Sequence, residues 1–107
     1  MTNAGLEPER RRSALRHGSE ALATLTALQH KWLLMNSTRP AARDLEPVIK
    51  DLTKALGILA DSRADHWAAA PVLRSVAQTL LDMANSDLEQ PQRDAQLAYE
   101  EIAAHRE

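Results

Sequence analysis

The chain of 107 residues contains no cysteine and no phenylalanine, and only 3% of its residues are aromatic. Without cysteine it has neither a disulfide framework nor a thiolate metal site. Valine and isoleucine occur three times each, so the β-branched and aromatic residues that are enriched in strands are scarce. These absences argue against a sheet protein and against a small domain held together by disulfides.

Long apolar runs are also absent. No stretch approaches the roughly 18 apolar residues of a membrane-spanning helix. The first residues include no apolar segment typical of a secretory signal, so we expect a cytoplasmic protein with no membrane contact. Thirteen basic and fifteen acidic side chains leave a net charge of −2, which argues against a broad surface for nucleic acid or membranes.

Alanine and leucine dominate the residues that are present. With 19 alanines and 16 leucines they make up about a third of the chain, a composition typical of helices. The length fits one domain, which we assign to residues 1–107, with residues 1–7 expected to form a flexible N-terminal segment.

Prolines at 8, 40, 47, 71 and 91 divide the chain, because proline is tolerated in the first turn of a helix but breaks its interior. Apolar residues recur at helical spacing between them. In the first segment they include Leu25, Trp32 and Leu33. The predicted helices are 8–35, 40–60 or alternatively 45–60 with Asp44 as its cap, 71–86 after a short turn at 65–70, and 91–105.

Four amphipathic helices with short connections predict an all-α, up-down helical bundle, with its third helix interrupted at Pro71. Alternatively, 71–86 and 91–105 form one kinked helix in a three-helix arrangement. The first helix would be about 42 Å long, whereas a globule of this size is roughly 34 Å across. The bundle is therefore expected to be elongated, or its first helix projects beyond it.

Several apolar residues do not fit the main stripe of their own helix. Each alone is explained by a bundle helix that buries more than one face, but together they indicate a second apolar surface. We therefore predict self-association, most simply as a homodimer. The candidate interface residues are Leu15, Leu34, Ile58, Trp67, Leu81 and Leu97.

Three further large or polar residues have specific predicted positions. Trp32 is expected to close the end of the bundle. Trp67 either packs under the connection that precedes the third helix or is an exposed interface anchor. Gln29 lies in the apolar stripe of the first helix, where it either sets the register of packing or faces the rim of the bundle.

No motif indicates catalysis, a bound cofactor or a metal. The chain has no G-x-S-x-G turn and no glycine-rich phosphate loop. His17 and Glu20 share a helix face, as do Glu101 and His105, but neither pair has the spacing of a di-iron or zinc site. We therefore expect solvated surface pairs, no catalytic or cofactor-binding residues, and a protein that is not an enzyme.

The resulting functional hypothesis is a small non-catalytic protein–protein interaction module, such as an adaptor, a small chaperone or an inhibitor of the immunity type. Its partner would be a second copy of itself, another protein, or both. The alternative is an accessory protein for nucleic acid, in which an N-terminal arginine cluster contacts phosphates. That cluster comprises Arg10, Arg11, Arg12 and Arg16. A third reading, a carrier of apolar ligands, would need a cavity between the helices.

Overall fold

The computed structural model describes residues 6–104, which form four α-helices and no strand. The helices are α1 (Pro8–Leu33), α2 (Arg39–Ala60), α3 (Ala69–Asp82) and α4 (Glu89–Ala103), with short 3₁₀ turns η1 (His66–Ala68) and η2 (Ser86–Leu88). The predicted all-α class is therefore confirmed. Among residues 6–104, no helix combines the length and the apolar character needed to cross a membrane.

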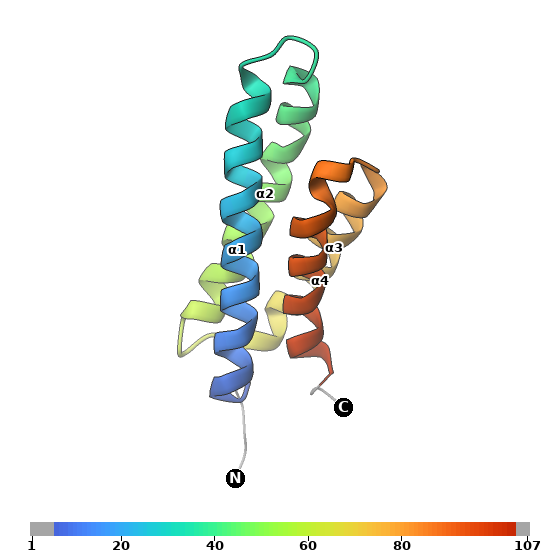
Figure 1. Ribbon diagram of the computed structural model, residues 1–107. Helices are drawn as coiled ribbons and strands as arrows, with labels where there is room; N and C mark the ends of the chain where they lie inside the picture. The colour runs from blue at the N-terminus through green and yellow to red at the C-terminus, as the bar shows by residue number, and fades with distance from the viewer. Residues whose placement is uncertain (1–5, 105–107) are drawn as a thin grey trace.

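The helices run alternately up and down, and each packs against its two neighbours in the order α1–α2–α3–α4–α1 (Figure 1). The bundle is elongated, with a length more than twice its width. Its two halves differ in length, because α1 and α2 have 26 and 22 residues whereas α3 and α4 have 14 and 15. The α1–α2 hairpin therefore extends past the end of α3 and α4 (Figure 1).

The buried residues of α1 change in size along the helix. Ala14, Gly18 and Ala21 are buried in the half of α1 that packs against both α2 and α4. Leu25 and Trp32 are buried further along, toward the end where the hairpin extends alone. Small residues allow close helix contact where four helices meet, and larger side chains fill the space where fewer helices contribute. Trp32, only 4% exposed, closes the hairpin end as expected.

Two helices begin with the same local chemistry. The side chain of Asp65 accepts a hydrogen bond from the backbone N–H of Trp67, and that of Asn85 accepts one from Asp87. Each of these capping residues is followed by a 3₁₀ turn and then by a helix whose third residue is proline. Both helices therefore begin two residues before the start predicted at proline. Pro71 and Pro91 still lie within the first turn, where proline is tolerated because the N–H groups of a first turn have no helical acceptor.

The predicted interruption at Pro71 is consequently misplaced, since the break lies before Ala69. The alternative of one kinked helix over residues 71–105 is also wrong. After α3 the chain reverses through Ala84, which has a left-handed backbone with φ of 52°. The side-chain cap of Asn85 then starts the next turn, and α4 packs back against α3. Alanine rarely adopts a left-handed backbone, so nothing in the sequence indicated that the chain reverses at this residue.

Pro47 lies inside α2, so the prediction of a helix starting at Leu45 is wrong. The helix begins at Arg39, with Pro40 in its first turn. Pro47 has no N–H to donate to the carbonyl of Arg43, but both residues are exposed, so water can satisfy that carbonyl. The well-formed leucine stripe on the opposite side of α2 outweighs the cost of this one missing hydrogen bond.

The ends of the chain also differ from the prediction. α1 ends at Leu33, which is 41% exposed although it was assigned to the buried stripe beside Trp32. At the N-terminus, residues 1–5 lie outside the described part of the chain, whereas Leu6 is buried against the bundle rather than part of a flexible segment. The predicted helix end at His105 also lies outside the described residues.

Gly18 and Gly57 offer a matched test of helix contact. A Cβ at Gly18 would lie 2.6 Å from Cδ2 of Leu56, whereas a Cβ at Gly57 would meet nothing within 4 Å. We expect Gly57→Ala to stabilise the protein by about 0.5–1 kcal/mol through helix propensity. Gly18→Ala should be less stable than Gly57→Ala by about 0.3–1 kcal/mol, because Cδ2 at the end of the flexible Leu56 side chain has to move. Urea unfolding followed by circular dichroism measures both, and equal stabilisation would contradict close packing at Gly18.

Candidate functional site

Large apolar side chains are exposed at three places on the described surface. Leu33, Leu34 and Met35 lie together at the end of α1, at the tip of the α1–α2 hairpin. Leu81 lies near the end of α3 and is 56% exposed. Leu97, on α4, is 37% exposed.

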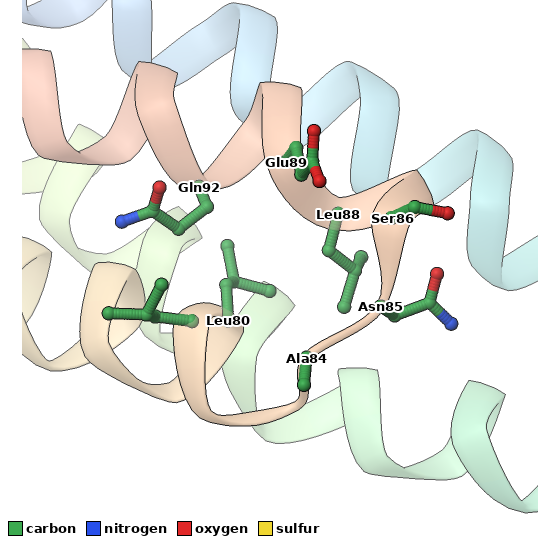
Figure 2. A pocket seen from close by; sticks show the side chains of 8 residues that line it. Leu80, Ala84, Asn85, Ser86, Leu88, Glu89 and Gln92 are labelled. Carbon is green, nitrogen blue, oxygen red and sulfur yellow. The ribbon is translucent and has the colours of Figure 1, made fainter.

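Leu81 lies beside a surface hollow of about 400 Å³ between α3 and α4. Figure 2 shows side chains from the end of α3, the connecting turn and the start of α4 around this hollow. Leu80 and Leu88 also line it, although each is almost fully buried, and Glu89 and Gln92 come from α4. Ala84, the residue with the left-handed backbone, lines the hollow at the turn between the two helices.

A second hollow of about 350 Å³ adjoins the first along the same two helices. Leu81 and Gln92 line both hollows, and Tyr99 lines the second. Among the residues that line them, Glu89 and Arg74 are the only charged ones. We call this surface, from Arg74 to Leu88 on one side and from Glu89 to Tyr99 on the other, the α3–α4 face. An exposed leucine among uncharged polar side chains fits the pattern of a protein interface, in which charged residues are depleted at the apolar centre and polar residues form the rim.

The six predicted interface residues therefore divide into two groups. Leu15, Ile58 and Trp67 pack against the core and are only partly exposed. Leu34, Leu81 and Leu97 are exposed, but the structure does not bring them together. Leu97 lies in a separate hollow beside Arg10 and Glu101. Leu34 lies at the hairpin tip.

Two exposed residues escaped the sequence prediction. Leu33 and Met35 flank Leu34 at the hairpin tip. The available signal was the run of three apolar residues directly before the polar break at 36–39. The predicted helix includes this run up to Met35, with Leu33 in its apolar stripe, whereas α1 ends at Leu33.

Gln29 joins α1 to α2. Its Nε2 donates to the carbonyl oxygen of Ala42 at 3.1 Å and to Oε1 of Glu46 at 2.8 Å. Both contacts are to the neighbouring helix, so this polar residue in an apolar stripe fixes how the two helices sit against each other.

The predicted arginine cluster is divided by the fold. Arg10 forms an ion pair with Glu101, with Nη1 and Oε1 2.7 Å apart. Arg11 donates to the carbonyl oxygen of Leu59 at 2.9 Å. Arg12 and Arg16 are exposed and make no hydrogen bond or ion pair with the described residues. Half of the cluster thus ties the helices of the bundle together instead of facing a ligand.

Arg10 belongs to a row of polar side chains along the contact between α1 and α4, which we call the polar seam. It comprises Arg10, Ser13 and Glu101 and, further along, His17, Glu20 and Asp94. Glu101 accepts hydrogen bonds from Arg10 at 2.7 Å and from the hydroxyl of Ser13 at 2.6 Å. These two bonds, and then the positive charge of Arg10, hold the pKa of Glu101 below its ordinary value, although partial burial opposes the shift. Glu101 therefore contacts α1 instead of facing only solvent. The predicted surface pair with His105 is not tested, because His105 lies outside the described residues.

Further along the same seam, Asp94 of α4 joins His17 and Glu20 of α1. One ligand atom from each of these three residues lies within 4.8 Å of the others. The sequence predicted that His17 and Glu20 share a helix face but could not identify Asp94, which is 74 positions beyond Glu20. Only the antiparallel contact of α1 with α4 brings the third residue to the pair.

Comparison of the chain with protein-family models, with curated proteins and with solved structures finds no match. Functional inference therefore rests on the two features described above, the α3–α4 face and the polar seam between α1 and α4.

The polar seam predicts a pH-dependent contribution to stability. The lowered pKa of Glu101 adds stability above the ordinary glutamate value of 4.5, and this stability is lost as the pH falls through the lower folded-state pKa. We expect Glu101→Gln to destabilise the protein by about 1 kcal/mol at about pH 7, since the pair is partly exposed, and by less at about pH 3.

Urea unfolding at the two pH values measures this difference. Glu100→Gln is the matched control, because exposed Glu100 accepts only from Gln96 one turn away. A loss from Glu101→Gln that is the same at both pH values would show that the carboxylate charge is not the source of the stability.

Proposed function

We propose that the chain is a non-catalytic protein–protein interaction module that self-associates through the α3–α4 face. The observation that carries the proposal is Leu81, a leucine 56% exposed at the junction of two adjoining hollows. An exposed leucine beside an apolar hollow is complementary to a second copy of the same surface. In a two-fold dimer, Leu81 of each copy would occupy the hollow of the other, so that one contact is made twice.

The chemistry around Leu81 supports an interface. Tyr99 and Arg74 are residue types enriched at the centres of protein interfaces, whereas acidic residues and lysine are depleted there. The glutamines of this face can pair with each other across a two-fold axis without leaving a buried charge. Gln78, Gln92 and Gln96 supply these amides.

The size of the face indicates the strength of the dimer. A pair of helices of 14 and 15 residues presents a surface about 21 Å long and about 20 Å wide. This corresponds to roughly 400 Å² on each copy, or about 800 Å² in total, which is below the range of stable interfaces and within that of weak, transient ones. We therefore expect a reversible dimer in the micromolar range and not an obligate one.

The nucleic-acid alternative has weaker support. Arg10 and Arg11 already bind Glu101 and the carbonyl of Leu59 within the bundle. Binding phosphate with either residue would cost the contact it makes in the folded protein. Arg12 and Arg16 alone offer a much smaller positive surface than the cluster predicted from the sequence.

Sedimentation equilibrium over about 5–200 μM protein tests self-association. We expect the wild type to shift from monomer to dimer across this range, and Leu81→Asp to remain a monomer, because each aspartate would bury an unpaired charge in the hollow of the other copy. Leu34→Asp is the matched control, since Leu34 is also exposed but lies at the hairpin tip. Circular dichroism of each variant verifies that the helices are retained.

A wild type that is monomeric at every concentration would overturn the proposed dimer. Loss of the dimer in Leu34→Asp, with Leu81→Asp still dimeric, would move the interface to the hairpin tip and overturn the assignment to the α3–α4 face.

A further inference from the structure

We propose that His17, Glu20 and Asp94 bind a divalent transition-metal cation across the contact between α1 and α4. The three residues offer one ring nitrogen and two carboxylate oxygens that lie within 4.8 Å of one another. They come from two neighbouring helices, an arrangement from which metal sites in helical bundles are built. This site is separate from the α3–α4 face and does not depend on the proposed dimer.

Asp94 is the strongest indication. It is only 5% exposed, and its one hydrogen bond comes from Gln90 Nε2, 3.2 Å from Oδ1. Within residues 6–104 no lysine, arginine or histidine nitrogen lies within ion-pair distance of its carboxylate. Buried carboxylates are normally paired with a cation or bound to a metal, because an uncompensated charge is costly to desolvate. The carboxylate of Asp94 therefore has no compensating positive charge among the described residues.

His17 supplies a complementary indication. Its Nδ1 is buried and has no hydrogen-bond partner among the described residues. Buried ring nitrogens of histidine are usually hydrogen-bonded, so an orphaned one requires an explanation. A neutral imidazole has a lone pair on one nitrogen, which is the donor that a transition metal binds. His17, with its orphaned ring nitrogen, and Asp94, with no cation beside its carboxylate, thus belong to the same three-residue cluster.

Glu20 completes the charge and provides access. It is exposed, so a hydrated ion can reach the cluster from the solvent side of α1. Two carboxylates with a neutral imidazole carry a charge of −2, which a divalent cation neutralises. Bonds of about 2.1 Å in tetrahedral geometry place ligand atoms about 3.4 Å apart, so the side chains of His17, Glu20 and Asp94 must move closer together when the ion binds.

The donor set selects the class of metal. Imidazole nitrogen with carboxylate oxygen suits Zn²⁺, Co²⁺, Mn²⁺ or Fe²⁺, whereas Ca²⁺ and Mg²⁺ prefer oxygen alone. Three protein ligands leave at least one coordination position to water. By the Irving–Williams order, Co²⁺ should bind more tightly than Mn²⁺, and a four-coordinate site with an imidazole ligand favours Zn²⁺.

Cobalt absorption spectroscopy tests the site on the full chain without an affinity tag. We expect Co²⁺ to bind with one ion per chain and to develop visible bands of low coordination number, which Zn²⁺ displaces and millimolar Mg²⁺ does not. Asp94→Asn preserves the side-chain shape and the acceptor for Gln90. That variant, His17→Gln and Glu20→Gln should each weaken Co²⁺ binding at least tenfold.

His30→Gln and Asp44→Asn are the matched controls, because both residues are exposed and lie outside the cluster. Both should bind Co²⁺ as the wild type does. The thermal midpoint provides a second readout, since Co²⁺ should raise it in the wild type and in Asp44→Asn but not in Asp94→Asn.

Absence of Co²⁺ and Zn²⁺ binding at millimolar concentration would overturn the proposal. Undiminished binding in Glu20→Gln and Asp94→Asn would also overturn it, because the ion would then bind elsewhere on the surface. Because Glu20 is exposed, Glu20→Gln is expected to fold. This variant therefore tests the site even if Asp94→Asn, at a buried position, does not fold.

Discussion

Close contact along α1 is the constraint on which the rest of the structure depends. With no phenylalanine and little valine or isoleucine, the core is built from leucine and alanine, which gain from burial only if helices approach closely. Gly18 allows this approach, since its backbone lies against Leu56 of α2. The same helix contacts α4 on its other side, where Ser13 and Glu101 are joined by a hydrogen bond.

The unequal lengths of the two hairpins determine which surfaces remain uncovered. α3 and α4 are short because a left-handed residue at Ala84 and a side-chain cap at Asn85 reverse the chain early. The reversal leaves Leu81 beside a hollow and leaves the tip of the longer α1–α2 hairpin without neighbours from α3 and α4. Apolar surface that a longer second hairpin would have buried is therefore available to a partner.

The seam between α1 and α4 contrasts with that apolar surface. At one end, Glu101 is compensated by Arg10 and Ser13, and its lowered pKa reflects the balance of these contacts over partial burial. Toward the middle, Asp94 is more deeply buried but has no cation within the described residues. The two carboxylates thus lie on the same helix in opposite electrostatic situations, and the difference between them identifies the candidate cation site.

Composition and periodicity by themselves determined the all-α class, the four helices and an elongated bundle, because the spacing of leucines and the positions of prolines act locally. They also placed His17 beside Glu20, since residues three apart share a helix face. They did not predict that α2 continues through Pro47, where packing outweighs a local preference, or that the chain reverses at Ala84. Only the tertiary structure decided that Asp94 joins His17, that Arg10 is engaged by Glu101, and that Leu81 is exposed, because antiparallel helix contact joins residues that are far apart in the chain.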